Sequence, residues 1–296
     1  MFAKDAKPVI DWTTITLMTI FHVLAAYALT MFTMSALISF LVMYAVSVLG
    51  ITMGFHRLHC HRSFKAPVWL GRVLAFMGTL ALQGSIKEWV ALHRMHHIGS
   101  DTPDDPHNAS RGFMHSHLYW MFVKDTKFDD LKLQNRFSRD IISDPFLRFI
   151  SEPIVMIGLQ VVLGLLLWAL FGVEAMMWGI WLRLVAVYHV TWLVNSASHM
   201  FGYRNFILKD DRATNCWWVG LLAFGEGWHN NHHAVADSAR HGLKWWEFDI
   251  TWQFIKIFRV LGVVTDVKVA QLPEAEITSE PKVADRQVIR SASMRA

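Results

Sequence analysis

The chain has 296 residues and a formal net charge of +4, with 53% hydrophobic and only 18% charged residues. This composition, which includes 14 Trp and 20 Phe, excludes an ordinary soluble domain and indicates a protein that places apolar surface in a membrane. The small excess of basic charge suits anionic lipid headgroups and acidic redox partners, and it gives little reason to expect a nucleic-acid partner.

The first apolar region runs from Thr13 to Phe55 and contains no Asp, Glu, Lys or Arg. As a single helix it would be roughly 65 Å long, about twice the thickness of the bilayer core. The region therefore predicts two membrane spans, at about 13–33 and 36–55, joined by a tight turn.

Three further apolar stretches follow. The stretch from Val73 to Ile86 is short for a span, so we expect a re-entrant or interfacial helix there. The other two predict spans at about 153–173 and 175–197. We expect Arg183, inside the last span, to snorkel to the outer face or to pair with Glu174, and a substrate contact is the alternative. The predicted fold class is an all-α membrane protein with four transmembrane helices in two hairpins.

The distribution of basic residues predicts the orientation of the chain. The hairpin tips at 30–35 and 172–175 contain no Lys or Arg, whereas the connection 56–152 contains thirteen and the chain after Phe201 contains twelve. By the positive-inside rule, both termini and both large polar regions are cytoplasmic.

This topology predicts one membrane domain over residues 1–266. Its cytoplasmic regions, 56–152 and 198–266, are expected to form a helical cap. The polar tail at 267–296 is expected to be disordered, because it lacks aromatic residues.

The chain contains 16 histidines, and most of them fall into three clusters, at 56–61, 93–97 and 229–233. Imidazole binds zinc, copper, iron and nickel, and eight clustered imidazoles exceed what one ion can hold. A pair of metal ions is the economical interpretation. A single cluster could equally be a set of interfacial histidines, but three clusters on one side of a membrane favour metal binding.

The spacing within the clusters favours convergence. Helical positions i, i+3 and i+4 face the same way, which holds for the last two clusters. The segment Gly225–Gly227 before the third cluster predicts a turn. His56 and His61 lie about 140° apart on an ideal helix, so they converge only if the helix ends or distorts there.

Asn195 and His199 lie four residues apart at the predicted cytoplasmic end of the last span. Polar side chains are costly in a span unless they are functional or face the bundle interior. We interpret His199 as a ninth ligand and Asn195 as the residue that holds a metal-bound water. Hydrogen bonds between helices are the alternative for both residues.

Several motifs carry a resemblance to a known family: Gly54–Leu58 with His61–Lys65, Glu88–Trp89 with His93–His97, Asp105–His107, Asn195–His199, and Gly225–His233. With these motifs the sequence resembles the integral-membrane fatty acid desaturases, particularly the Δ9 acyl-lipid and acyl-CoA group, from about Ile51 to Asp266.

The resemblance implies an O2-dependent enzyme with two iron ions held by nine histidines: His56, His61, His93, His96, His97, His199, His229, His232 and His233. It implies that Asn195 meets the metal through water. It also implies that Gln83, Trp89 and Thr191 shape the acyl tunnel, although each is equally readable as core packing.

Two positions depart from the family pattern. His59 stands where the family usually has an apolar or small residue, and we assign it no ligand role. Ala91 and Leu92 replace an Arg–Asp pair that contacts the nucleotide end of the substrate in acyl-CoA members. The loss of this pair favours an acyl chain esterified to a membrane lipid over a thioester.

The predicted reaction is insertion of a cis double bond, at Δ9, into an acyl chain. Electrons are expected from a separate carrier of the ferredoxin or cytochrome b5 type. We expect carboxylates to orient the imidazoles, with Glu88, Glu226 and Asp101 as candidates by proximity in sequence. A diiron hydroxylase or ketolase is the alternative within enzymes, and a membrane metal carrier or haem-binding anchor is the alternative outside them.

Overall fold

The computed structural model describes residues 9–124, 127–209, 211–270, 272 and 283–284. The chain divides into two compact units, each assembled from three separate segments. The first unit comprises Met1–Phe55, Arg72–Leu92 and Leu118–Val190, and the second comprises His56–Gly71, His93–His117 and Thr191–Ala296. Because the segments alternate along the chain, four of the described helices start in one unit and end in the other.

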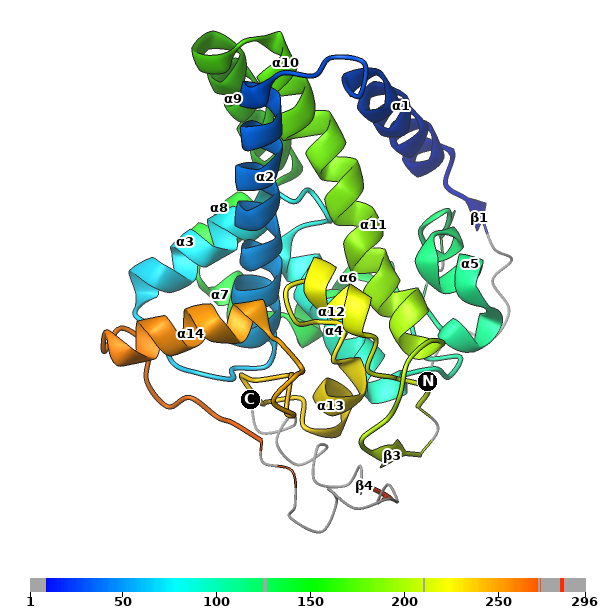
Figure 1. The fold of residues 1–296 in the computed structure, drawn as a ribbon. Helices are drawn as coiled ribbons and strands as arrows, with labels where there is room; N and C mark the ends of the chain where they lie inside the picture. The colour runs from blue at the N-terminus through cyan, green and yellow to red at the C-terminus, as the bar shows by residue number, and fades with distance from the viewer. Residues whose placement is uncertain (1–8, 125–126, 210, 271, 273–282, 285–296) are drawn as a thin grey trace. The chain divides into compact units, whose positions relative to one another are not determined.

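The architecture is helical, as the sequence predicts (Figure 1). The helices that lie within the first unit are α1 Trp12–Ala28, α2 Met34–Leu49, η3 Tyr119–Met121, α6 Leu131–Phe137, α7 Arg139–Ser143, α8 Pro145–Ile150, α9 Pro153–Phe171, α10 Val173–Met177 and η4 Trp178–Leu182. The helix α3 Val68–Thr79 begins in the second unit and ends in the first. Those within the second unit are η2 Ala109–Arg111, α5 Phe113–His117, η5 Ala197–His199, α12 Trp217–Leu222, α13 His229–Ala234 and α14 Ile250–Val260.

The helices that cross from the first unit to the second are η1 Gly50–Cys60, α4 Ile86–Gly99 and α11 Arg183–Ser196. In the described part of the chain, the strands are two residues long. β1 Val9–Ile10 pairs antiparallel with β2 Val123–Lys124, and β3 Ile207–Leu208 pairs parallel with β4 Val283–Ala284.

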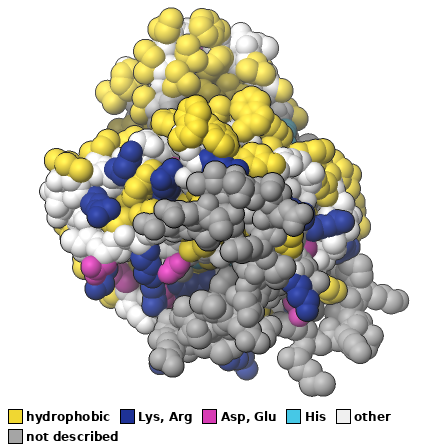
Figure 2. Space-filling model, turned by 60° about the horizontal axis from the view of Figure 1, so that its bottom comes forward, with side chains coloured by type: hydrophobic (Ala, Val, Ile, Leu, Met, Phe, Trp, Pro, Cys, Tyr) yellow, Lys and Arg dark blue, Asp and Glu magenta, His cyan; other side chains and the backbone are white. Residues whose placement is uncertain are grey.

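Three helical stretches among the described residues are long and apolar enough to cross a membrane: Met34–Cys60, Pro153–Phe171 and Val173–His199. The first predicted span corresponds to α1, which is apolar but has only 17 residues. Hydrophobic side chains along α9 point outward, and Figure 2 shows such side chains gathered over a continuous area of the visible face. Exposed apolar surface of this extent is typical of a protein that contacts lipid.

Polar groups near the predicted hairpin tips hold the first unit together. The indole Nε1 of Trp178 donates a hydrogen bond of 2.7 Å to the carbonyl of Ala28, and the Ser39 hydroxyl donates one of 2.9 Å to the carbonyl of Ala175. Ala28, Ala36, Met177 and Trp178 form a buried cluster at this end. Each bond joins a side-chain donor of one helix to a backbone carbonyl of another, η4 to α1 and α2 to α10.

The interfacial helix that the sequence predicts at 73–86 has different boundaries. The helix α3 begins at Val68, directly after Pro67, and ends at Thr79. The segment 80–85 is not helical, since Leu82 and Gly84 have φ angles of 51° and 84°. The prediction used charged residues as boundaries, but helix ends depend on backbone conformation and capping.

Arg183 neither snorkels nor pairs with Glu174, so both expectations for this residue are wrong. Its side chain is fully buried in the first unit. The guanidinium donates to the carbonyls of Gly179 and Leu80 and to the side chains of Gln160 and Ser47.

The predicted tail at 267–296 lies largely outside the described residues. Within it, the backbone N–H of Lys268 donates to the carbonyl of Ser63, and the N–H of Ala270 donates to the Ser238 hydroxyl.

Candidate metal centre

The first histidine cluster converges because η1 is a π-helix. The backbone N–H of His61 donates to the carbonyl of His56 at 3.0 Å, which is the i to i+5 bond of a π turn. The wider turn brings the two rings together, with their centroids 4.7 Å apart. The distortion that the spacing required is therefore present.

The other clusters come from short helical segments of the second unit. The C-terminal half of α4 provides His93, His96 and His97, and α13 consists largely of the third cluster. A turn precedes α13, as predicted from the glycines, with φ angles of 51° at Phe224 and 114° at Gly225. The 3-10 turn η5, which directly follows α11, provides His199.

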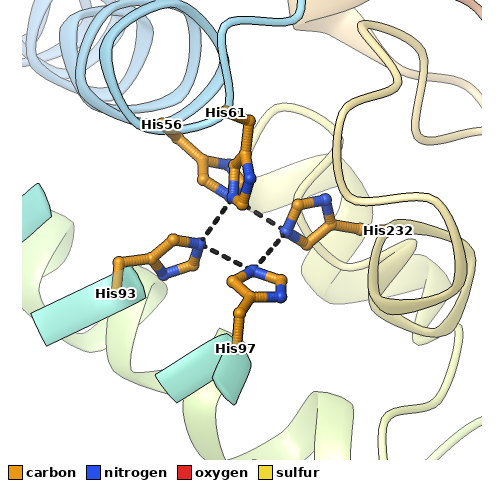
Figure 3. Close-up of side chains that lie close together, drawn as sticks. All are labelled: His56, His61, His93, His97 and His232. Carbon is orange, nitrogen blue, oxygen red and sulfur yellow. Dashed lines mark hydrogen bonds between the residues drawn. The ribbon is translucent and has the colours of Figure 1, made fainter. Parts of the chain in front are cut away.

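All nine predicted ligands lie in two groups, which we call the five-histidine group and the four-histidine group. The five-histidine group consists of His56, His61, His93, His97 and His232, and the four-histidine group consists of His96, His199, His229 and His233. Within each group, the ligand nitrogens lie within 4.8 Å of one another. Figure 3 shows the rings of the five-histidine group pointing toward a common centre.

The Nε2 atoms approach one another so closely that hydrogen bonding alone cannot satisfy them. In the five-histidine group the Nε2 of His93 lies 3.0 Å from both His61 and His97, and that of His232 lies 2.9 Å from His97 and 3.1 Å from His56. A neutral ring nitrogen carries either one proton or one lone pair. An Nε2 atom that lies between two other Nε2 atoms can therefore donate to one of them or accept from one of them, but it cannot form an ordinary N–H···N hydrogen bond with both.

A metal ion accounts for this geometry. Imidazole nitrogens bind such ions at about 2.1 Å, so two ligands at a right angle would lie about 3.0 Å apart. The Nε2 separations in the four-histidine group are similar, at 3.2 Å for His96–His233 and 3.1 Å for His199–His229. The residues present thus fit a pair of metal ions, one at each group.

Carboxylates lie on the opposite nitrogen of several rings. Nδ1 of His56 lies 2.6 Å from Glu226, and in the four-histidine group the Nδ1 partners are Asp105 for His96 at 3.0 Å, Asp101 for His199 at 2.9 Å and Asp211 for His233 at 2.7 Å. A carboxylate at Nδ1 keeps the proton there and leaves the Nε2 lone pair for a metal.

Arg57, in the first histidine cluster, contacts Glu226, which lies three residues before the third cluster. Its guanidinium is fully buried and lies 3.1 Å from Glu226 and 2.9 Å from Asp249. Asp249 also accepts a hydrogen bond from the backbone N–H of Trp252 and thereby caps α14. A buried guanidinium with two carboxylate partners holds these segments in a fixed arrangement.

Burial and mutual repulsion lower the pKa of several imidazoles of both groups. Burial lowers the pKa of His93 and His232 well below the usual value, and neighbouring imidazoles lower it further. The pKa of His233 is about 4, because burial outweighs the opposing effect of Asp211. Burial would raise the pKa of Glu226, but His56, Arg57 and His241 hold it well below the usual value. Neutral imidazoles and ionised carboxylates are the protonation states that metal binding requires.

Two polar side chains near the histidines were not predicted from the sequence, and one predicted carboxylate has another role. The imidazole of His241 is fully buried, with Nδ1 3.3 Å from Glu226, and Asp105 and Asp211 contact two imidazoles of the four-histidine group. Asp105 belongs to a motif of the family resemblance, but no local spacing signals His241 or Asp211. Glu88, proposed as an orienting carboxylate, instead caps α4 by accepting hydrogen bonds from Ser85.

The remaining predicted residues lie outside both groups. His59 Nε2 lies 3.1 Å from the carbonyl of Gly71. The amide of Gln83 donates to the carbonyl of Val187, and the ring of Trp89 packs edge-on against Phe55 at 5.9 Å. Thr191 and Asn195 lie on α11 and are half-buried.

The sequence comparisons agree with the geometry of the site. Residues 31–256 match the model of the family described as fatty acid desaturase. An sn-1 stearoyl-lipid 9-desaturase of Anabaena variabilis is 46% identical over 271 residues, covering 90% of this chain and 97% of the relative. An enzyme of the same name from Synechocystis sp. is 47% identical, covering 90% and 83%. An sn-2 palmitoyl-lipid 9-desaturase of Nostoc sp. is 39% identical, covering 89% and 92%. The chain belongs to the fatty acid desaturase family.

Proposed function

We propose that the chain inserts a cis double bond at Δ9 into an acyl chain esterified to a membrane lipid, with two iron ions and O2. The observation that carries the proposal is the convergence of nine imidazoles in two groups. Relatives at 46–47% identity are named stearoyl-lipid 9-desaturases, which favours desaturation over hydroxylation or metal transport. Replacement of a charged pair by Ala91 and Leu92 supports a lipid carrier over acyl-CoA.

An unactivated methylene group has no acidic proton that a side chain could remove. Two bound iron ions would supply the oxidising power, with O2 as oxidant and an external carrier as electron source. The nine imidazoles would hold the ions, and the carboxylates at Nδ1 would fix the ring orientations. The protein itself would therefore keep the imidazole rings neutral, exclude water from the site and position the acyl chain.

We propose that Gln83, Trp89 and Thr191 contact the acyl chain and that Asn195 meets a metal through water. The support is the match of these positions to the family pattern. The fixed contacts of Gln83 with Val187 and of Trp89 with Phe55 suit residues that shape a rigid surface.

For the whole chain, we propose one functional domain over residues 1–266 with four membrane spans, α1 being the first. We also propose that both termini and the metal centre are cytoplasmic. The charge distribution supports this orientation. Electrons would then come from a cytoplasmic ferredoxin or cytochrome b5 type carrier.

The proposal is tested by expressing the chain in a host that lacks its own desaturase and locating the double bond in each lipid class by mass spectrometry. The wild-type chain should produce a Δ9 alkene in glycerolipids. His97→Ala should abolish the product, because it removes one imidazole of the five-histidine group.

His59→Ala is the matched control, since His59 is a histidine of η1 whose ring binds a backbone carbonyl outside both groups. It should retain most of the wild-type activity. Full activity of His97→Ala, or a hydroxylated product without an alkene, contradicts the proposed function. The relatives differ in glycerol position, so the distribution of the alkene between sn-1 and sn-2 identifies the preferred position.

A further inference from the structure

The four-histidine group is surrounded by aspartates. Three of its four imidazoles have an aspartate at Nδ1, and the distances are between 2.7 and 3.0 Å. All three carboxylates are buried, with side-chain exposures of 1% for Asp105, 2% for Asp101 and 5% for Asp211. Buried charges act strongly on a nearby cation, because little water screens them.

Backbone N–H groups hold these carboxylates in place. Asp101 accepts from the N–H of Arg212, and Asp211 accepts from that of Ala213. Asp105 accepts from the N–H of Asp101 and of His107. A backbone N–H stabilises the ionised form without adding a full positive charge. These contacts therefore leave the negative charge available to a bound metal.

The carboxylate at the five-histidine group has different surroundings. Glu226 contacts His56 Nδ1 at 2.6 Å, but it also contacts the guanidinium of Arg57 at 3.1 Å. This guanidinium is fully buried and adjacent to His56 in the sequence. Asp249 lies 2.9 Å from the same guanidinium, so the two carboxylates and the one guanidinium leave a net charge of −1 here, against −3 for the three aspartates at the four-histidine group.

We propose that the two groups bind divalent metal ions with unequal affinity and that the four-histidine group is the tighter site. Asp101, Asp105 and Asp211 act as positioning residues that fix the imidazoles, and their three buried carboxylates supply negative charge to the bound ion. The inference rests on the proposed pair of metal ions. It predicts that the group with fewer imidazoles fills first.

The test is titration of the metal-free, full-length protein in detergent micelles with Co²⁺ alone, followed by calorimetry and by the visible spectrum of the bound ion. The wild-type protein should bind two equivalents in two steps. Asp101→Asn, Asp105→Asn and Asp211→Asn should each weaken the tighter step by about 10–100-fold and leave the weaker step unchanged. Glu226→Gln should weaken the second step only.

Asp104→Asn, an exposed aspartate in the same loop, is the matched control and should change neither step. Circular dichroism and thermal melting of each metal-free variant establish that it is folded, and the Asn substitutions keep the size of the side chain. Two equal steps in the wild-type protein, or aspartate variants that weaken the second step or both steps equally, overturn the inference while the metal pair stands. Binding of fewer than two equivalents by the wild-type protein contradicts the proposed function instead.

Discussion

At the scale of single residues, Arg183 is the most unusual polar side chain of the first unit. It is fully buried, and its described partners are neutral: Nε donates to the carbonyl of Gly179 at 2.9 Å and Nη2 to Oε1 of Gln160 at 3.0 Å. Nη1 and the amide of Gln160 both donate to the carbonyl of Leu80. The carbonyl at the end of α3 thus has two side-chain donors in place of the next helical turn.

This network predicts that Arg183→Lys destabilises the protein. A lysine keeps the buried charge but cannot reach the same acceptors with a planar fork. We expect a loss of roughly 2–4 kcal/mol, because several hydrogen bonds to a charged group are lost or distorted. Thermal unfolding in detergent measures it, with the exposed Arg148→Lys as control. Equal melting temperatures for the two variants would show that the network does not stabilise the fold.

The convergence of the nine histidines could be predicted from the sequence, and so could two of the four carboxylates at their Nδ1 atoms, Glu226 and Asp101. Helical spacing alone places His93, His96 and His97 on one face, and the resemblance supplied the rest of the set. The partner of His233 is Asp211, which lies 22 positions away and precedes it. Such a contact depends on how loops fold back, and no periodicity in the sequence records it.

At the scale of elements, the close approach of α3 to the start of η1 is a consequence of two glycines. A Cβ at Gly50 would lie 2.1 Å from the backbone nitrogen of Gly78, and a Cβ at Gly78 would lie 2.5 Å from the ring of Phe55. A backbone atom cannot rotate away as a side chain can. The two helices would have to separate to admit a methyl group.

We therefore expect Gly50→Ala to destabilise the protein by about 3 kcal/mol or more. The matched control is Gly158→Ala in α9, where nothing lies within 4 Å of the added methyl group. That variant should be neutral or slightly more stable, since alanine favours the helix by about 1 kcal/mol. Chemical or thermal unfolding of both variants provides the comparison. The contact assignment fails if the two substitutions have the same effect.

Element boundaries were the weakest part of the sequence prediction. The apolar stretches coincide with helices of the structure: 36–55 with α2 and the start of η1, 153–173 with α9, and 175–197 with α10, η4 and α11. The stretch 73–86 was misplaced because it joins the end of α3 to a non-helical turn of similar hydropathy. Hydropathy records the environment of a segment, whereas the left-handed conformation of Leu82 depends on tertiary contacts.

At the scale of the whole molecule, the buried imidazoles predict acid sensitivity of the metal-free protein. The pKa of His233 and of His241 is about 4 in the folded chain, and burial lowers that of His93 and His232 well below 6.5. Unfolded histidines titrate near 6.5, so between about pH 4 and 6.5 the unfolded state binds more protons. Stability therefore falls as the pH falls through this window.

The expected result is a melting temperature that drops by about 10 °C or more between pH 7 and pH 5 in the presence of a chelator. Saturating Co²⁺ should move the drop to lower pH, because a bound ion excludes protons from the ring nitrogens. A chelated sample with the same melting temperature at pH 7 and pH 5 contradicts the neutral, buried state of the imidazoles.

The orientation of the chain determines which side of the membrane can deliver electrons to the metal centre. The hairpin tips at 30–35 and 172–175 lack Lys and Arg, whereas the polar regions carry nearly all of them, which predicts a cytoplasmic metal centre.

Both native cysteines, Cys60 and Cys216, are buried. Thr30→Cys and Lys256→Cys, at exposed positions, therefore provide reporters for the two sides. A membrane-impermeant maleimide should label Thr30→Cys in intact cells and Lys256→Cys only after permeabilisation. The reverse pattern would place the histidines outside, beyond the reach of a cytoplasmic carrier, and would require a different source of electrons.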